Sequence, residues 1–367
     1  MRIGIAVSIL SVSLVAMGCG GGDDSSYGEA PAPTPSAAAE EPAGPDVAAL
    51  RLRANSLFGP LPAEAANPDN PSTPERVALG QVLYVDPRLS KNHDVSCNSC
   101  HRLDGYGVDG EPTSPGHKGQ RGGRNSPTSF NAALHIAQFW DGRAADVEEQ
   151  AKGPVLNPIE MAMPSVEAVE LTLRSIPGYA PMFAAAFPGE EQPITFDNMA
   201  LAIAAFERKL LTPGPFDDFM NGRDDALSAQ QLRGLETFVD TGCITCHVGA
   251  AVGGGAFQKL GLFKPYETED TGRMEVTGKE GDRHIFKVPS LRNVAQTGPW
   301  FHDGSLTDLD QVVRIMAEYQ LGKTLDDAQV ADIVAFLGAL TGTAPAELVA
   351  IPELPESGPD TPAPDPT

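Results

Sequence analysis

Two short segments of the chain place a pair of cysteines three positions apart, with a histidine directly after the second cysteine. They read CNSCH at residues 97–101 and CITCH at residues 243–247. A CxxC pair can carry out thiol–disulfide exchange, and two such pairs can hold a structural zinc ion. Neither chemistry requires the histidine. Attachment of a c-type haem does, because the thiols bond the porphyrin while the adjacent histidine binds the iron. We therefore predict two covalently bound haem c groups.

The two motifs indicate which residues would hold these groups. The covalent attachment sites are Cys97, Cys100, Cys243 and Cys246, and the proximal iron ligands are His101 and His247. The ligand on the opposite face of each iron decides the function. A second strong ligand gives an electron carrier, whereas an open or openable position gives an enzyme.

Several side chains could fill these opposite positions. The other histidines are His93, His117, His135, His284 and His302, and the methionines after the second motif are Met274 and Met316. Met274 lies in a polar loop sequence and Met316 in a helical one. A lone methionine in a helix usually belongs to the core, and a lone histidine is usually structural or exposed. The residue types and spacing therefore leave the choice open.

The cysteine count and the charge narrow the class of protein. The 367 residues include five cysteines, and the two motifs use all of them except Cys19. Exported proteins usually spend spare cysteines on disulfides, and here no pair is spare. The formal net charge is −23. Such a chain is not expected to bind nucleic acid, because contacts to phosphate need Lys and Arg.

The N-terminus is typical of an exported protein. Arg2 precedes an apolar run over residues 3–17, which is the layout of a secretory signal and too short for a confident membrane span. Gly18 and Cys19 close the run and resemble a bacterial lipoprotein box. We predict a signal over residues 1–19, lipidation of Cys19 and a periplasmic protein tethered to a membrane. A plain cleaved signal peptide is the alternative.

The remaining chain is expected to be mostly α-helical with long ordered loops. Thr73 and Pro74 mark a helix start, and Ser228 with Gln231 could cap the helix before the second motif. Apolar residues recur at helical spacing before residue 210 and after residue 330. The expected organisation begins with a disordered acidic Gly- and Pro-rich linker over 20–50, followed by two cytochrome c-like domains over 51–212 and 213–345, each with one haem. A Pro-rich acidic tail follows over 346–367, and its residues 351–367 are expected to be disordered.

Two longer segments resemble the bacterial dihaem cytochrome c peroxidase family. Residues 116–162 contain NSP, FWDGRA and NPIEMA, and residues 286–322 contain KVPSLRNV followed by FHDGS. The resemblance covers about residues 60–345. It implies an oxidoreductase that reduces hydrogen peroxide to water. The first domain would carry a low-potential peroxidatic haem, and the second a high-potential electron-transfer haem.

The resemblance also implies roles around the first haem. His117, in GHKG, would be a removable ligand of the first iron. Glu160 would be the distal acid–base residue, with Gln150 beside it. Trp140 would lie on the electron path between the haems. A carboxyl group in a dry pocket suits this chemistry, because burial raises its pKa toward the working pH.

Further roles are implied around the second haem. Met316 would be the second ligand of its iron, in preference to Met274. A calcium ion between the haems would be held by Asn125, Thr297 and Pro299, the last two through backbone carbonyls. His302 would lie near the second haem. One electron on this haem would trigger a loop change that releases His117, a redox-gated switch, and the Gly-rich run KGQRGGR would give that loop freedom to move.

The resemblance implies a small electron-donor protein, either a c-type cytochrome or a cupredoxin, and a homodimer as a family expectation. Three alternatives stay open. The methylamine dehydrogenase maturation enzyme is related, but it uses a tyrosine where this chain has Met316. A dihaem electron carrier would keep both irons six-coordinate. A peroxide sensor would bind without turnover. Glu160 and the His117 loop favour turnover.

Overall fold

The structure is a computed structural model that describes residues 44–367. The predicted signal over residues 1–19, the lipidated Cys19 and nearly all of the predicted linker lie outside the described residues. Within residues 44–367, no helix is both long enough and apolar enough to cross a membrane.

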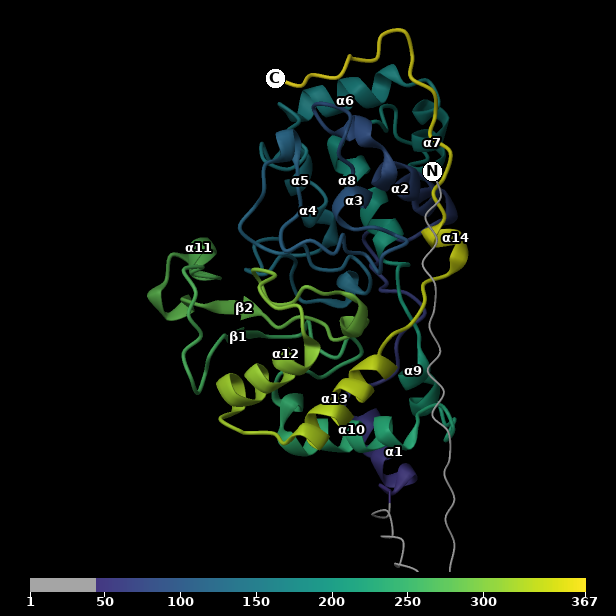
Figure 1. Cartoon of the computed structure of the whole chain (residues 1–367). Helices are drawn as coiled ribbons and strands as arrows, with labels where there is room; N and C mark the ends of the chain where they lie inside the picture. The colour runs from purple at the N-terminus through teal and green to yellow at the C-terminus, as the bar shows by residue number, and fades with distance from the viewer. Residues whose placement is uncertain (1–43) are drawn as a thin grey trace, which may run out of the picture. The chain divides into compact units, whose positions relative to one another are not determined.

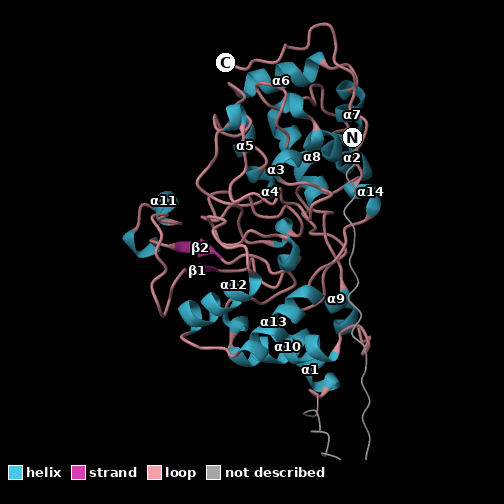
Figure 2. Ribbon diagram, viewed as in Figure 1, coloured by secondary structure: helices cyan, strands magenta, loops and turns pink. Residues whose placement is uncertain are grey.

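Helices supply nearly all the regular structure of these residues, which confirms the prediction of a mostly α fold (Figures 1 and 2). The α-helices are α1 (Val47–Leu57), α2 (Pro74–Val85), α3 (Cys97–Cys100), α4 (Val147–Gln150), α5 (Gly153–Leu156), α6 (Val166–Ser175), α7 (Tyr179–Ala186), α8 (Phe196–Glu207), α9 (Pro215–Met220), α10 (Ala229–Thr241), α11 (Met274–Thr277), α12 (Leu309–Ile315), α13 (Asp327–Ala339) and α14 (Ala346–Val349). Strands β1 (Phe257–Lys259) and β2 (Ile285–Lys287) pair antiparallel, with Phe257 opposite Lys287. Long loops join these elements.

A first hydrophobic core forms around the packed helices α2 and α8 and also takes in α6 and α7. We call this part the first lobe. The expected helix start is confirmed, because Thr73 caps α2 through the Arg76 amide and Pro74 occupies the first helical position. Gly80 lies where α2 meets α8, and a Cβ there would overlap the Ala202 carbonyl. The absence of a side chain therefore lets the two helices approach closely.

A second hydrophobic core forms around α10 and α13, and we call this part the second lobe. The predicted capping box of α10 is confirmed by the reciprocal hydrogen bonds between Ser228 and Gln231. Gly234 plays the part that Gly80 plays in the first lobe, since a Cβ there would overlap the Asp332 carbonyl of α13. Each lobe is thus built on one pair of helices that cross at a glycine of the helix preceding its CxxCH motif.

Helix α1 precedes the first lobe in the sequence but packs in the second lobe. Leu50, Ala54 and Phe58 are buried in the second core, and the Phe58 ring meets Phe216 edge-on at 5.4 Å. We expected the linker to continue to residue 50 and the following residues to join the first domain. The structure differs at both points: Asp46 caps a helix that begins at Val47, and its apolar face packs beside α9.

The C-terminal tail also differs from the expectation of disorder. After α14 the chain runs extended along the first lobe, past α7 and α6 (yellow in Figure 1). Side chains of the lobe bond it at several points: Arg88 donates to the Pro355 carbonyl at 2.8 Å, and Lys91 donates to the Thr367 carbonyl at 2.8 Å. A Pro-rich segment has few amides to satisfy, so donors on the lobe can hold it through its carbonyls.

Candidate haem sites

The second motif follows directly from the end of α10. Gly242 ends this helix in the left-handed conformation, with φ of +100°, and Cys243–Thr245 then form one tight turn. The His247 Nδ1 lies 3.4 Å from the Val252 carbonyl, which holds the ring and leaves Nε2 as the atom that can bind a metal. Burial lowers the pKa of His247 to about 4, so the imidazole is neutral and ready to act as a ligand.

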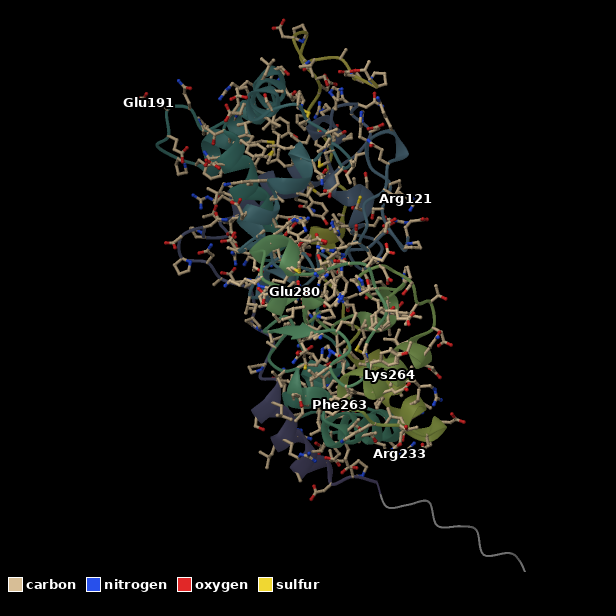
Figure 3. All side chains as sticks on the ribbon, turned by 90° about the vertical axis from the view of Figure 1, so that its left-hand side faces the viewer. Arg121, Glu191, Arg233, Phe263, Lys264 and Glu280 are labelled. Atoms are coloured by element: carbon tan, nitrogen blue, oxygen red, sulfur yellow. The ribbon has the colours of Figure 1, made fainter. Side chains whose placement is uncertain are left out.

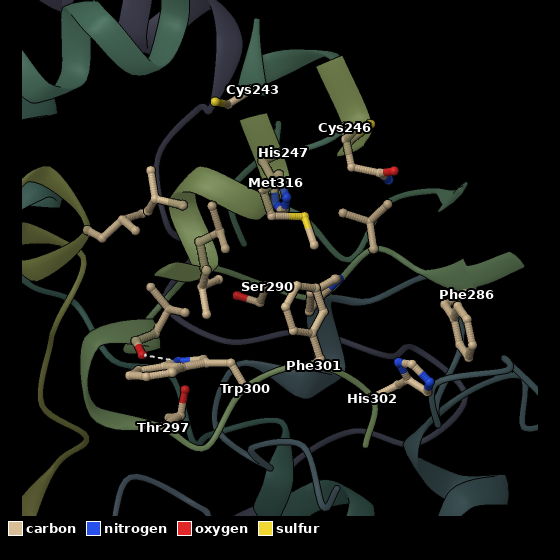
Figure 4. Close-up of a pocket in the computed structure, with 18 of the residues that line it drawn as sticks. Cys243, Cys246, His247, Phe286, Ser290, Thr297, Trp300, Phe301, His302 and Met316 are labelled. Carbon is tan, nitrogen blue, oxygen red and sulfur yellow. Dashed lines mark hydrogen bonds between the residues drawn. The ribbon is translucent and has the colours of Figure 1, made fainter. Parts of the chain in front are cut away.

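These residues line a large apolar cavity (Figure 4). Its unfilled space is about 1700 Å³, a volume that includes the part open to solvent, and its walls are mostly apolar side chains from both lobes. In Figure 4 Cys243 and Cys246 lie at one end, and Trp300 lies at the other, with its indole donating to the Val294 carbonyl at 2.9 Å. The apolar walls, the two thiols and the His247 imidazole fit a haem group.

Met316 lines the same cavity, whereas Met274 in α11 is not among the described residues that do so. Met316 follows α12 and begins a short π-helical segment that ends at Gln320. Such segments are rare and often mark functional sites. The arrangement favours Met316 over Met274 as the residue that could face an iron bound by His247.

The first motif is built in a parallel way. Ser96 and Ser99 form a capping box around the short helix α3, which carries both cysteines. The His101 Nδ1 lies 3.3 Å from the Gly107 carbonyl, and burial lowers the pKa of the ring, as it does for His247. Both histidines are thus held through Nδ1 by a carbonyl a few residues further along the chain.

The state of the four thiols argues against the other chemistries of a CxxC pair. They form no disulfide in the structure. Burial raises the pKa of Cys243 to about 12 and that of Cys100 to about 11. A redox dithiol or a zinc ligand needs an accessible thiolate. Partly buried thiols with a raised pKa fit covalent attachment of haem better.

His117 and Glu160 are packed against each other on two adjacent loops. The His117 amide donates to the Glu160 carbonyl at 2.7 Å, and a Cβ at Gly116 would overlap the Ile159 carbonyl, so glycine permits the approach. His117 is only 5% exposed. Its Nε2 lies 3.3 Å from the Thr367 carbonyl of the tail, and its Nδ1 is buried without a partner.

Glu160 is a half-buried carboxyl group with an altered acidity. Burial raises its pKa, while the Arg143 charge and a 2.9 Å hydrogen bond from the Asn157 amide oppose the shift. The Glu160 charge in turn contributes to the raised pKa of Cys97 and Cys100, which places it close to the first motif. Gln150 ends α4 and is half-buried; no hydrogen bond joins its side chain to Glu160 among the described residues.

Trp140 connects the two lobes. Its indole Nε1 donates to the Asn125 carbonyl at 2.9 Å, and its own carbonyl accepts from the Lys287 amide at 2.7 Å. Trp140 comes from a first-lobe loop but lines the cavity of the second motif. It therefore joins a loop of the first lobe to the cavity of the second motif.

Asn125, Thr297 and Pro299, the residues assigned to calcium, all line this cavity. The Asn125 amide nitrogen donates to the Glu111 and Pro112 carbonyls, so its Oδ1 is the atom left for a cation. Over residues 44–367, no group of three or more His, Cys, Asp or Glu side chains could hold a metal ion. A calcium ion would therefore depend on neutral oxygens from these three residues and on water.

His302 is buried in the same region. Its Nε2 lies 3.0 Å from the Thr268 hydroxyl, and its carbonyl accepts from the Asn125 amide at 2.7 Å. Its ring packs tilted against Phe286, with 4.5 Å between the ring centroids. It therefore joins the proposed calcium region to the loop that follows His117.

Sequence reasoning missed a network of charges between the lobes. Arg124 donates to Asp141 at 2.5 Å and to Asp270 at 2.6 Å, and it also reaches Glu275. It missed His135 as well, which we treated as structural or surface. His135 lines the cavity of the second motif, beside the buried Lys287. The motif KVPSLRNV, which contains Lys287, was the sequence feature that could have drawn attention to this pair.

The fold and site agree with comparisons to known proteins. A family model of "Di-haem cytochrome c peroxidase" matches residues 74–225, and a "Cytochrome c" model matches residues 231–341. The cytochrome c551 peroxidase of Pseudomonas aeruginosa is 47% identical over 323 residues, covering 86% of this chain and 92% of that protein. The cytochrome c551 peroxidase of Nitrosomonas europaea is 46% identical, covering 87% of this chain and 97% of that protein.

More distant likenesses follow the same fold. The methylamine utilization protein MauG of Methylorubrum extorquens is 35% identical, covering 84% of this chain and 89% of that protein. The crystal structure of a MauG-like protein associated with microbial copper homeostasis matches with a TM-score of 0.70 at 27% identity, covering 83% of this chain and 97% of that one.

These matches define the class as a dihaem c-type cytochrome. The chain belongs to the di-haem cytochrome c peroxidase family, with one haem c region in each lobe, and it is an enzyme of the peroxidase class.

Proposed function

We propose that this enzyme reduces hydrogen peroxide to water with electrons from a small redox protein. In this reaction H2O2 takes up two electrons and two protons and gives two molecules of water. When bound, haem would supply the electrons and the iron at which the O–O bond breaks. The observation that carries the proposal is the half-buried Glu160 carboxyl, packed against the His117 loop beside the first motif.

Glu160 would move the proton that this reaction needs. A base must take a proton from one peroxide oxygen and return it to the oxygen that leaves as water. Burial raises the pKa of Glu160, which makes its carboxylate a better base and its acid form available as a donor. The Asn157 amide donates to Oε1 of Glu160, so Oε2 would be the oxygen that exchanges the proton with peroxide. Gln150, at the end of α4, would orient the peroxide.

His117 would control access to the first site. With His101 on one face of the iron and His117 on the other, peroxide would be excluded. His117 is followed by Lys118, which has a φ of +59°, and by Gly119, Gly122 and Gly123, where a Cβ would meet no atom within 4 Å. This open surrounding supports a loop that can swing His117 away.

The second lobe would receive electrons from the donor and pass them to the first. His247 and Met316 would hold the second iron, and a thioether ligand raises its reduction potential relative to a second histidine. Trp140, bonded to Asn125 on one side and to Lys287 on the other, would lie on the route. Electrons would thus enter near the second motif and reach the first through the contact between the lobes.

A calcium ion bound by Asn125, Thr297 and Pro299 would hold the two lobes in register. Asn125 is adjacent to Arg124, so the ion would also fix the end of the His117 loop.

We propose in addition that the enzyme is exported to the periplasm, tethered through Cys19, and served by a c-type cytochrome or a cupredoxin.

Met316 also bears on the related protein-modifying enzymes. The tyrosine nearest in sequence, Tyr319, faces Tyr266 at 6.1 Å between ring centroids and is not among the described residues that line the cavity. The second iron would therefore have a thioether ligand and not a phenolate. This supports a peroxidase in preference to an oxidase of a protein substrate.

The test is steady-state turnover of peroxide by the purified dihaem protein, with a reduced c-type cytochrome or cupredoxin as donor. We expect two donor molecules to be oxidised for each peroxide consumed. A variant with Cys97 and Cys100 replaced by Ala should lose turnover while it keeps the second haem. No turnover with any donor, in protein that holds both haems, would favour an electron carrier or a sensor instead.

A further inference from the structure

Lys287 is a buried cation that the proposed reaction does not use. It ends β2, is 5% exposed, and lines the cavity of the second motif together with Cys246 and Gln258. Its Nζ lies 3.0 Å from the His135 Nδ1. Within residues 44–367, no carboxylate lies within 4 Å of this ammonium group. Buried lysines are almost always paired with an acid.

The surrounding chain holds Lys287 and His135 in place. The Lys287 amide donates to the Trp140 carbonyl at 2.7 Å, and the residue stands opposite Phe257 in the strand pair. The His135 ring lies against Gly254, where a Cβ would overlap it. Gly254 has a φ of +74° and its carbonyl accepts from the Ile136 amide. Segments from both lobes thus build this pair.

The hydrogen bonding of the pair leaves two donors without an acceptor. Since an ammonium group can only donate, the His135 Nδ1 accepts from Lys287, and the ring proton must be on Nε2. This Nε2 is buried and has no partner. The remaining protons of the Lys287 ammonium and the Nε2 proton of His135 therefore lie at the same cavity. The described chain provides no anion there to accept hydrogen bonds from them.

The cost of this arrangement points to a ligand. Burial lowers the pKa of Lys287 to about 8 and that of His135 well below its ordinary value, with the Lys287 charge adding to the latter shift. Removing an unpaired charge from water costs several kcal/mol, and a natural fold keeps such a group where a partner arrives with the opposite charge.

We propose that Lys287 and His135 form a carboxylate site for a propionate of the haem at the second motif. The ammonium would donate to the propionate, and the His135 Nε2 would be a second donor. A positive charge held beside the haem in a dry cavity favours the reduced state, because reduction adds a negative charge. The site would therefore raise the potential of the second haem, which goes beyond the peroxidase function and does not depend on it.

The experiment is a spectroelectrochemical titration of the dihaem protein and of Lys287→Met. A chain with Cys243 and Cys246 replaced by Ala, which holds only the first haem, identifies the transition of the second. We expect Lys287→Met to lower the equilibrium constant for one-electron reduction of the second haem at least tenfold. This corresponds to a fall of about 59 mV in its reduction potential. Lys287→Arg keeps the charge and should restore most of the shift.

Lys323→Met is the matched control. Lys323 is exposed, its Nζ donates to the Thr241 carbonyl at 2.7 Å, and its charge acts on Cys243 of the same motif. Solvent screens this charge, so its removal should move the potential much less. If Lys287→Met loses the second haem, the titration of Lys287→Gln decides. A second-haem potential that stays unchanged in Lys287→Met or Lys287→Gln, or that moves equally in Lys323→Met, would overturn the proposal.

Discussion

The histidines of the two CxxCH motifs are held in place in the same way. His101 and His247 are both partly buried, and each directs Nδ1 to a backbone carbonyl, that of Gly107 or of Val252. A buried imidazole stays neutral, so Nε2 carries a lone pair and can bind a metal. The adjacent cysteines are partly buried, and the loss of water contact raises the pKa of their thiols. The local chemistry of each motif is therefore set by burial and by one carbonyl.

Glu160 provides the first prediction at this scale. Replacing it with Gln removes the proton-transfer group but keeps the shape and the bond from Asn157. We expect kcat for peroxide to fall by roughly 10²- to 10⁴-fold, with the haem spectra preserved. The matched control is Glu191→Gln, because Glu191 lies on the surface (Figure 3). A kcat within threefold of the parent enzyme for Glu160→Gln would show that another group moves the proton.

Glu207, at the end of α8, provides a prediction about pH. Burial and the nearby Glu148 charge raise its pKa from 4.5 to about 8. The folded chain thus keeps a proton that the unfolded chain releases, so this group's contribution to stability falls as the pH rises from about 4.5 to about 8. One pKa unit corresponds to about 1.4 kcal/mol.

The check is urea unfolding followed by circular dichroism over this range of pH. Glu207→Gln cannot ionise, so it should unfold at the same urea concentration as the parent protein near pH 4.5 and at a higher concentration near pH 8. A constant difference at every pH would mean that the ionisation of Glu207 does not contribute.

At the scale of elements, two crossing helix pairs position the motifs. Helix α2 packs on α8 and α10 packs on α13, with Gly80 and Gly234 at the points of closest approach. Each motif then follows the first helix of its pair, so the crossing determines where the cysteines and the histidine enter the lobe. The loops between the lobes carry most of the other site residues.

These crossings predict the effect of one added methyl group. Gly80→Ala and Gly234→Ala should each destabilise the protein by about 1–3 kcal/mol or more, because a Cβ would overlap the facing carbonyl. Gly338→Ala is the control, since Gly338 lies in α13 with no atom within 4 Å of a Cβ, and alanine is the better helix former by about 1 kcal/mol. Thermal unfolding should lower Tm for the first two variants only. Equal Tm values for all three would contradict the close approach.

The sequence predicted these elements unevenly. The capping of α2 and α10 depends on neighbouring residues, so Thr73 and Ser228 could be identified directly. The packing of α1 on the second lobe depends on contacts with Phe216, far along the chain, and no local pattern reveals it. The pairing of Lys287 with His135 has the same cause, because two loops that are distant in sequence meet only in the fold.

At the scale of the whole described chain, several loops tie the first lobe to the second. Arg124, seven positions after His117, bonds Asp270 across the contact, and the Asn125 amide bonds the His302 carbonyl. Arg121 lies between His117 and Arg124 in the sequence and is at the surface (Figure 3). Phe263 of the second lobe is also at the surface, with 66% of its area exposed. A change at the second site could reach His117 through these bonds.

The tail is the other long-range feature. Removing residues 351–367 should destabilise the first lobe, since Arg88 and Lys91 lose the carbonyls of Pro355 and Thr367. Hydrogen exchange of the α2 amides should become faster, while that of α10 and α13 in the same sample should not change. Unchanged exchange in α2 would show that the tail does not support the lobe.

The most direct test of the account compares peroxide turnover by the fully oxidised and the half-reduced enzyme, with calcium present, for the parent protein and for His117→Gly. We expect the parent protein to turn over rapidly only after half-reduction, because His117 would first have to leave the iron, and we expect His117→Gly to be active in both states. Equal activity of the parent protein in both states would contradict the gating role of His117. The absence of turnover in every state and variant, with both haems intact, would contradict the peroxidase function itself.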